Sequence, residues 1–219
     1  YAVKFYNLNK NPCSAAGRIG KKNAGEMNIW TLEEFKQFIE AIKHKKEAVV
    51  GFNILFYTGM RVGEMLALTI SDIDFEKCKI RINKTFQRIK RTDVISTPKT
   101  PKSKRTIDCP KFVIDIIQDY IKILYKPTPK TRLFEGFTKF KFQNDINVYS
   151  KKANLKKIRV HDLRHSHATF LLSKGVNIVS LSRRLGHERV STTLDIYSHI
   201  LKEDEDLIKD ILNNLQKQY

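Results

Sequence analysis

Two different spacings of apolar residues divide the chain and restrict what it can fold into. Over most of the length, apolar residues such as Leu32, Phe35 and Phe38 recur about every three to four positions, which is the spacing of one helix face. Between about 78 and 109 they instead alternate with polar residues, and many are β-branched, which is typical of half-buried strands. We therefore predict an α+β fold that is mainly helical, with one small antiparallel sheet.

Local signals mark where several of the helices begin and end. Thr31 followed by Glu34 is the capping-box pattern of a helix start. Gly59 and Gly186 each follow an apolar stretch, and glycine most easily takes the left-handed conformation that ends a helix. The pattern predicts a short helix from Arg61, further helices at 47–58, 112–124, 161–174, 177–185, 191–199 and 203–217, and a short strand at 132–135.

Positive charge is concentrated in two parts of the sequence. The 219 residues carry a formal net charge of +18, and residues 77–105 alone hold eleven basic side chains and one acid. Residues 139–159 hold seven basic side chains and one acid. A basic surface of this size indicates a polyanionic partner, with nucleic acid the first candidate. The alternative is a lysine-rich face that only contacts solvent.

Other classes of protein fit the sequence poorly. The longest apolar stretch, 48–57, is too short to cross a bilayer, and no secretory signal is visible, so we expect a cytoplasmic protein without a membrane partner. Three scattered cysteines match no zinc or disulfide framework. Residues 1–25 are rich in Asn, Gly and Lys and lack sustained periodicity, which predicts a linker or the tail of a preceding domain.

A few polar residues have the chemistry and spacing of a phosphate site. His161 and Arg164 are one helical turn apart, so that a guanidinium that suits phosphate and an imidazole that can move a proton share one face. The alternative is an ordinary surface helix start. Arg61 stands beside a turn and a helix N-terminus, where an anion is favoured. His187 directly follows a helix-ending glycine, and Tyr197, taken alone, would be a core or rim residue.

The three histidines His161, His165 and His167 also raise the question of a metal site. Helical spacing brings the first two together but directs His167 elsewhere, and no cysteine or acid cluster completes a ligand shell. We therefore expect no metal. A phosphodiester transfer without one needs a nucleophile, cations and a proton donor, and the candidate residues together supply all three.

Four segments resemble the motif boxes of the tyrosine recombinases, the integrases of phages and conjugative transposons. They are TGMRVGEMLALTISDID at 58–74, TPKTPKSKRTI at 97–107, HDLRHSHATFLLSKGVNIVSLSRRLGH at 161–187 and STTLDIYSHI at 191–200. The resemblance implies that Tyr197 is the nucleophile and that Lys99, with Lys102 as its rival, is the catalytic lysine of a β-hairpin turn. It further implies that the remaining catalytic residues are Arg61, His161, Arg164 and His187.

The same resemblance implies the domain organisation. Members usually carry an N-terminal core-binding domain, so residues 1–25 are expected to be the linker or tail of such a domain and residues 26–219 the catalytic domain. The missing domain would form half of the DNA clamp.

The implied activity is site-specific DNA recombination that integrates or excises a mobile element. Tyr197 would attack the scissile phosphate, with His161 helping to remove its proton, and form a 3′-phosphotyrosine. No cofactor is implied, and the sequence has no GxxxxGK phosphate loop. The implied partners are double-stranded recombination sites, further copies of the protein in a tetramer on synapsed DNA, and accessory DNA-bending or excision factors, in a bacterial nucleoid. A type IB topoisomerase and a non-catalytic DNA-binding protein are the alternatives.

Overall fold

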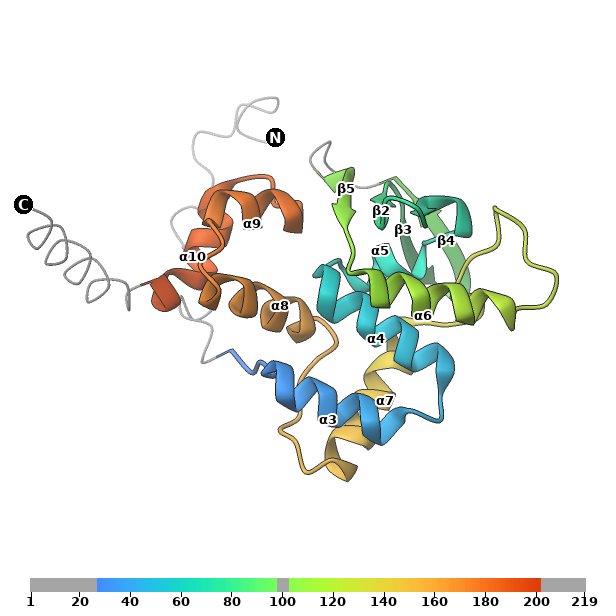
Figure 1. The fold of residues 1–219 in the computed structure, drawn as a ribbon, viewed down its shortest axis with the longest axis horizontal. Helices are drawn as coiled ribbons and strands as arrows, with labels where there is room; N and C mark the ends of the chain where they lie inside the picture. The colour runs from blue at the N-terminus through green and yellow to red at the C-terminus, as the bar shows by residue number, and fades with distance from the viewer. Residues whose placement is uncertain (1–26, 98–102, 202–219) are drawn as a thin grey trace, which may run out of the picture.

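The computed structural model describes residues 27–97 and 103–201 of the chain, and this part folds into helices around two small sheets (Figure 1). The α+β fold with mostly helical content is confirmed. The helices are α3 (Leu32–Ile42), α4 (Lys46–Thr58), α5 (Val62–Leu66), the 3₁₀ helix η1 (Ile70–Asp72), α6 (Lys111–Lys122), α7 (Lys139–Lys152), α8 (Asp162–Ser173), α9 (Ile178–Leu185) and α10 (Val190–Leu201). The strands are β1 (Ile73–Asp74), β2 (Lys79–Ile82), β3 (Thr85–Ile89), β4 (Thr92–Ser96) and β5 (Arg105–Asp108). The helix predicted at 203–217 lies outside the described residues.

The helix ends follow the local signals in the sequence. The Thr31 hydroxyl accepts a hydrogen bond from the Glu34 N–H at 3.2 Å, and the Glu34 carboxylate accepts one from the Thr31 N–H at 2.7 Å, so the capping box is complete. Gly59 and Gly186 end α4 and α9 with φ of 67° and 69°. These left-handed angles explain why glycine stands at both positions.

The predicted antiparallel strands are present, but they form two sheets instead of one. β2 pairs with β1 on one side and with β5 on the other, whereas β3 pairs with β4 alone. Lys90 and Arg91 join β3 to β4 with φ of 47° and 68°, so the two strands close a tight hairpin on each other. The hairpin leaves β2 free to pair with β5.

The short strand predicted at 132–135 does not form. Arg132 makes only an isolated bridge to Thr69, and the chain then turns. Leu133 and Phe134 are apolar, as residues of a buried strand would be, but they are buried in a turn that ends at Gly136 with φ of 76°. Burial alone therefore produced the strand-like pattern.

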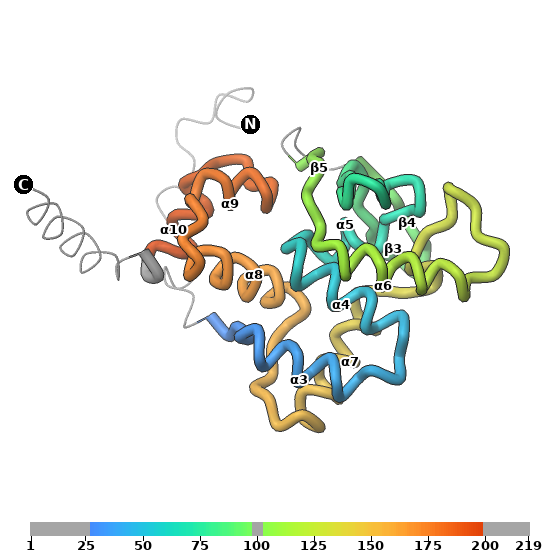
Figure 2. The backbone as a smooth tube through the Cα atoms, in the orientation of Figure 1, coloured from blue at the N-terminus to red at the C-terminus, as the bar shows by residue number. Residues whose placement is uncertain are grey.

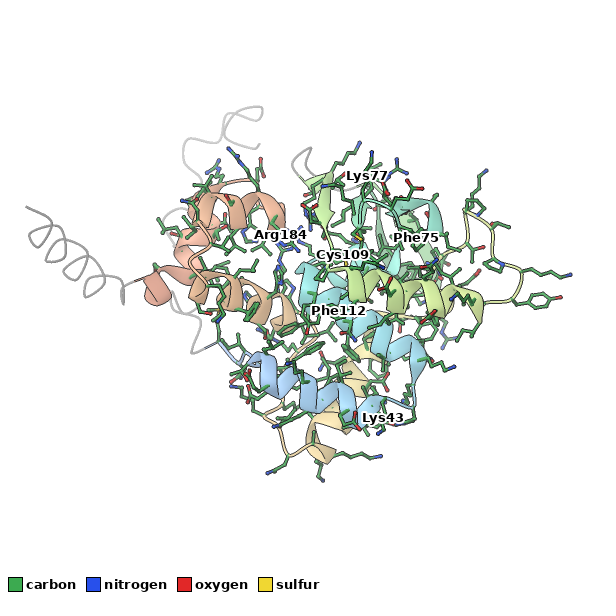
Figure 3. The ribbon with its side chains drawn as sticks, viewed as in Figure 1. Lys43, Phe75, Lys77, Cys109, Phe112 and Arg184 are labelled. Atoms are coloured by element: carbon green, nitrogen blue, oxygen red, sulfur yellow. The ribbon has the colours of Figure 1, made fainter. Side chains whose placement is uncertain are left out.

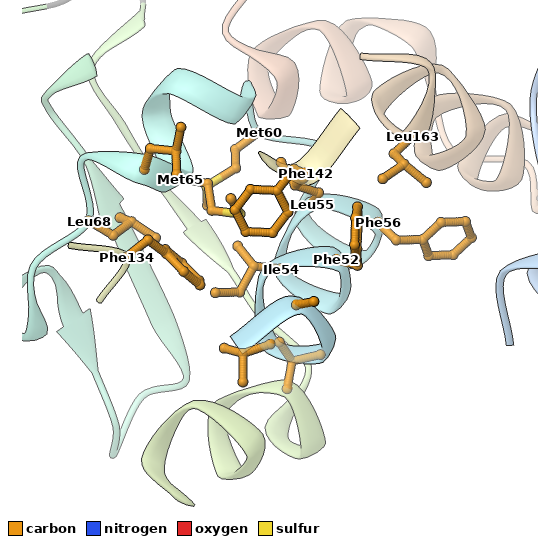
Figure 4. Packing of buried hydrophobic residues seen from close by; sticks show 14 of the residues in the cluster. Phe52, Ile54, Leu55, Phe56, Met60, Met65, Leu68, Phe134, Phe142 and Leu163 are labelled. Atoms are coloured by element: carbon orange, nitrogen blue, oxygen red, sulfur yellow. The ribbon is translucent and has the colours of Figure 1, made fainter. Parts of the chain in front are cut away.

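The main hydrophobic core is built around α4. Phe52 and Ile54 are fully buried (Figure 4). The Phe52 ring meets those of Phe38 and Phe142 edge-on, with centroids 4.9 and 5.2 Å apart. Offset and edge-on aromatic contacts of this kind stabilise a core beyond the area they bury. Because α4 is held from several sides, the turn after it, at Gly59 to Arg61, has a fixed position.

A second, smaller apolar cluster joins the last three described helices. Its buried members in the described part of the chain are Ala168, Leu172, Leu181, Leu185 and Tyr197. These residues hold α8, α9 and α10 together as a group beside the main body (Figure 2). Among the described residues, no helix is long and apolar enough to cross a membrane.

Candidate active site

Arg61 lies at the turn that connects α4 to α5. Its backbone N–H donates to Glu64 Oε2 at 2.8 Å, and its guanidinium donates to Glu64 Oε1 at 3.0 Å. The Arg61 side chain remains 40% exposed. A cation is therefore presented to solvent from a well-fixed backbone.

Glu64 is held by a second arginine that comes from β5. The Arg105 guanidinium binds both carboxylate oxygens of Glu64, at 3.1 and 2.9 Å, and both side chains are almost completely buried. Burial by itself would raise the pKa of Glu64, but the hydrogen bonds and charge of Arg105, helped by Arg61, hold this pKa below its usual value. Glu64 is therefore a carboxylate at neutral pH and fixes both arginines.

Arg164 is buried where α8 meets the turn after α4 and the end of α9. Its Nη1 donates to the Gly59 carbonyl at 2.9 Å, and its Nη2 donates to the Leu185 carbonyl at 2.8 Å. Burial, together with the positive charge of Arg61, lowers the pKa of Arg164 to about 9. The guanidinium is still charged at neutral pH, in surroundings of low polarity where it would attract a phosphate strongly.

The two histidines predicted for the site are neutral at pH 7. Burial lowers the pKa of His161 to about 4, with a contribution from the neighbouring His165. Burial and the charge of Arg164 likewise lower the pKa of His187 to about 4, and His187 Nδ1 lies 2.7 Å from the Thr193 hydroxyl. Each ring can therefore donate one hydrogen bond and accept another.

Tyr197 projects from α10 into the small apolar cluster and is only 1% exposed. Its hydroxyl forms a hydrogen bond of 2.9 Å with His165 Nδ1. Burial raises the pKa of Tyr197 to about 12, although the charge of Arg164 acts in the opposite direction. The expected nucleophile is thus a neutral phenol close to Arg164, and its hydrogen-bond partner is His165 rather than His161.

A cavity of about 910 Å³ opens beside these residues. Arg61 and His161 line this cavity. Phe86 of the hairpin strand β3 and Phe140 of the first turn of α7 also line it. Its other lining residues include Lys139 and Arg88. The cavity therefore has cations on its walls and an arginine–histidine pair at the candidate site.

The structure brings together five of the six residues expected at the site. In addition to burial, the charges of Arg61 and Arg164 both lower the pKa of His161 and of His187, and the charge of Arg164 also acts on the Tyr197 hydroxyl. The sixth, Lys99, and its rival Lys102 lie outside the described residues. No group of three or more His, Cys, Asp and Glu side chains in the described ranges could hold a metal ion.

Four further residues support this site and are not among the site residues predicted from the sequence. Glu64 and Arg105 form the buried ion pair, Thr193 contacts His187, and His165 contacts Tyr197. Glu64 three positions after Arg61 carried a local signal, because an acidic residue there commonly accepts the N–H at a helix start. The other three have partners that no short sequence pattern connects to them.

His167 packs against the turn at Gly59 and does not share the ring contact of His161 with His165, as its position on the helix predicted. It contacts Arg184 of α9, whose Nε donates to His167 Nε2 at 3.1 Å. Arg184 reaches from α9 toward β5 and donates to the Asp108 carbonyl at 3.0 Å (Figure 3). His167 therefore belongs to the packing between α8, α9 and the sheet.

An arginine pair, two neutral histidines and a buried tyrosine form one group, with the chemistry that a phosphate site needs, on a mostly helical α+β fold. The phage integrase family matches residues 29–204 of the chain. The chain therefore belongs to the phage integrase family, the tyrosine recombinases, and contains its catalytic domain.

Individual relatives agree with this assignment. The chain is 31% identical to the ICEBs1 integrase of Bacillus subtilis (strain 168), over 98% of this chain and 61% of the relative. It is 29% identical to a XerC-like tyrosine recombinase of Caldanaerobacter subterraneus, over 98% of this chain and 62% of the relative. The chain thus spans about three fifths of the length of these relatives.

Solved structures show the same fold. An integrase of the Tn1549 transposon in complex with transposon right end DNA has a TM-score of 0.75 at 24% identity, with 94% of this chain and 76% of that chain covered. The catalytic domain of bacteriophage HP1 integrase has a TM-score of 0.56 at 22% identity, with 80% and 89% covered. XerA recombinase has a TM-score of 0.66 at 26% identity, with 84% and 64% covered.

Proposed function

We propose that this chain is the catalytic part of a site-specific DNA recombinase that integrates or excises a mobile element. The observation that carries the proposal is the buried Tyr197 hydroxyl next to Arg164, in a site that also contains Arg61, His161 and His187. The names of the relatives support it, because they include the ICEBs1 integrase of Bacillus subtilis and a Tn1549 transposon integrase in complex with transposon right end DNA. Residues 1–25 are proposed to connect this domain to a core-binding domain.

In the proposed reaction, the Tyr197 oxygen forms a bond to the scissile phosphorus. The bond from phosphorus to the 5′ oxygen breaks, the phenolic proton leaves to a base, and the 5′ oxygen takes up a proton to become a hydroxyl. Arg61 and Arg164 would hold the charge that develops on the phosphoryl oxygens, and neutral His187 would donate a hydrogen bond there. Lys99 is proposed as the proton donor to the 5′ oxygen, with Lys102 as the alternative.

The covalent 3′-phosphotyrosine conserves the energy of the ester. Rejoining to a partner strand therefore needs no nucleotide cofactor. The proposed partners are two duplex recombination sites, further copies of the protein in a tetramer and accessory DNA-bending or excision factors. A type IB topoisomerase would use the same chemistry but reseal the same strand, and a strand-exchange assay with two duplexes distinguishes the two.

The first test uses the chain with a pool of nicked duplex oligonucleotides whose sequence is randomised around the nick. A nick next to the cleavage point lets the short product diffuse away, so the covalent adduct accumulates and can be selected as a species resistant to SDS. The wild-type chain should select a preferred sequence. Tyr197→Phe, which removes one oxygen and retains the ring, should form no adduct with that selected duplex, even in the presence of EDTA.

Tyr149 provides the matched control for this test. Its hydroxyl is also hydrogen-bonded to a histidine, since it lies 2.9 Å from His44 Nε2, but it is remote from the site. Tyr149→Phe should form the adduct at the wild-type rate. An adduct that persists in Tyr197→Phe, or that disappears in Tyr149→Phe, would overturn the assignment of Tyr197 as nucleophile.

A further inference from the structure

The residue in contact with the Tyr197 hydroxyl is His165, which the motif comparison did not assign. His165 lies one turn after His161 on α8, and the two rings meet edge-on with centroids 5.1 Å apart. Tyr197 comes from α10, 32 positions further along the chain, and its oxygen lies 2.9 Å from His165 Nδ1. The contact therefore joins two helices at the atom that is proposed to react.

The direction of this hydrogen bond decides what His165 can do. If Nδ1 carries the ring proton, the imidazole donates to the phenol oxygen and draws electrons away from the nucleophile. If Nε2 carries it, Nδ1 has a lone pair and accepts the phenolic O–H, which is the arrangement needed to remove that proton. Among the described residues, Tyr197 is the hydrogen-bond partner of His165 Nδ1.

We propose that His165 is a catalytic residue that accepts the phenolic proton of Tyr197 through Nδ1. This inference rests on the proposed function of Tyr197. As the Tyr197 oxygen bonds to phosphorus and the 5′ oxygen departs, the phenolic proton moves to Nδ1 and His165 becomes an imidazolium. When a 5′ hydroxyl later attacks the phosphotyrosine, the same proton returns to the phenol oxygen, so the cycle leaves His165 unchanged.

The surroundings of His165 suit a temporary positive charge of this kind. Burial is the main cause that lowers the pKa of His165 below its usual value, so the ring is neutral and able to accept a proton at pH 7. The Asp162 carboxylate acts in the opposite direction and would stabilise the imidazolium once formed. The other titratable or charged groups around it are His161, Arg159 and Arg164 from α8 and the turn before it, His187 from the α9–α10 turn, and Tyr197 from α10.

One measurement tests the proposal without any DNA. Nitrogen-15 NMR of the imidazole side chains in the wild-type chain distinguishes a protonated ring nitrogen from one with a lone pair. The proposal requires that His165 carry its proton on Nε2 at neutral pH, and that its Nδ1 signal change in Tyr197→Phe, where the donor is missing. A proton on Nδ1 would overturn it.

The second measurement is the pH dependence of adduct formation by His165→Asn in single-turnover reactions. The asparagine amide can replace Nδ1 as a hydrogen-bond acceptor but cannot take a proton. We expect a rate about 10²–10⁴-fold below wild type at pH 7. The deficit should shrink about tenfold per pH unit as hydroxide replaces the base, whereas a variant with a purely structural defect would show the same deficit at every pH.

The remote His44–Tyr149 pair again supplies the control. His44→Gln retains an acceptor near Nε2 and should leave both the rate and its pH profile unchanged. If Tyr197→Phe forms no adduct but His165→Asn keeps the wild-type pH profile, the proposed function stands and the role of His165 falls. If Tyr197→Phe still forms the adduct, it is the nucleophile assignment that fails, and the role of His165 fails with it.

Discussion

His167 shows how strongly its environment sets the chemistry of a single residue in this chain. It lies on the same helix as His165, but it is only 3% exposed, accepts a hydrogen bond from Arg184 and contacts the backbone of Phe56. Burial, together with the charge of Arg184, lowers the pKa of His167 to about 3. A proton on this ring would break the bond to Arg184 and place two cations side by side.

The depressed pKa of His167 makes the stability of the fold dependent on pH. An unfolded histidine has a pKa near 6.5, so the unfolded chain binds the proton more tightly and acid favours unfolding. Titration of His167 leaves the free energy of unfolding unchanged above pH ~6.5 and lowers it progressively as pH falls toward 3. Between pH 7 and pH 5, urea unfolding should show that wild type loses about 2 kcal/mol more than His167→Gln.

The difference between the two losses of unfolding free energy cancels the contributions of the other histidines, because both proteins contain them. His167→Gln will be less stable than wild type at pH 7, because a buried ring is lost, but its pH slope should be smaller. Equal losses in the two proteins between pH 7 and pH 5 would show that His167 titrates normally.

At the scale of secondary structure elements, Arg105 connects three parts of the fold. From β5 it binds Glu64 of α5, and its Nε donates to the Arg184 carbonyl of α9 at 2.7 Å. The same guanidinium explains the glycine at the end of α9, because a Cβ on Gly186 would lie 2.8 Å from Arg105 Nη1. These contacts fix the start of β5 against α5 and α9.

Loss of Arg105 should therefore be costly. Arg105→Met leaves the Glu64 carboxylate buried without its main partner, which should destabilise the fold by about 3–5 kcal/mol in urea unfolding at pH 7. Adding Glu64→Gln removes the buried charge while keeping an acceptor for the Arg61 N–H, and it should regain about 1–3 kcal/mol. The control is Lys79→Met, which removes an exposed pair with Asp108 and should cost at most about 1 kcal/mol. Similar losses in both single variants would contradict the buried-pair interpretation.

The sequence predicted elements better than it predicted contacts between them. Thr31 with Glu34, and the glycines 59 and 186, act within one helical turn, so their effect could be inferred from neighbouring residues. The Arg105–Glu64 pair spans 41 positions and the His165–Tyr197 contact spans 32. Contacts of this kind depend on how helices and strands pack, and a single sequence contains no periodic signal for them. The division of the strands into two sheets was missed for the same reason.

The charge of the whole molecule predicts how it binds DNA. The net charge of +18 and the exposed β3–β4 hairpin, with Lys90 and Arg91 at its turn, favour contacts with the phosphate backbone. This chain alone should bind duplex DNA weakly and mostly electrostatically. Contact with about 6–10 phosphates would weaken binding by roughly 10³–10⁵-fold between about 50 and 200 mM salt, which fluorescence anisotropy can measure.

Substitutions on the hairpin provide the internal comparison. Replacing both Lys90 and Arg91 by glutamine should reduce the slope of log affinity against log salt by about 2, because each lost phosphate contact removes about one. Lys43 lies far from the hairpin, at the corner between α3 and α4, and Lys43→Gln should not change the slope (Figure 3). A nearly flat salt dependence of the wild-type chain would show that the basic segment does not contact the backbone.

The small apolar cluster has a consequence for how much of the fold must move during a reaction. Tyr197 is its largest buried member and also the proposed nucleophile, while Arg61 and Glu64 are fixed to the main core. Regions with few buried apolar contacts open at a smaller free-energy cost than the whole domain unfolds. Any step that moves the Tyr197 side chain out of the cluster therefore loosens α10 from α8 and α9. Arg61 and Glu64 stay in place during such a step. Local opening of α10 and retention of Arg61 on its Glu64 carboxylate are, in this fold, compatible events.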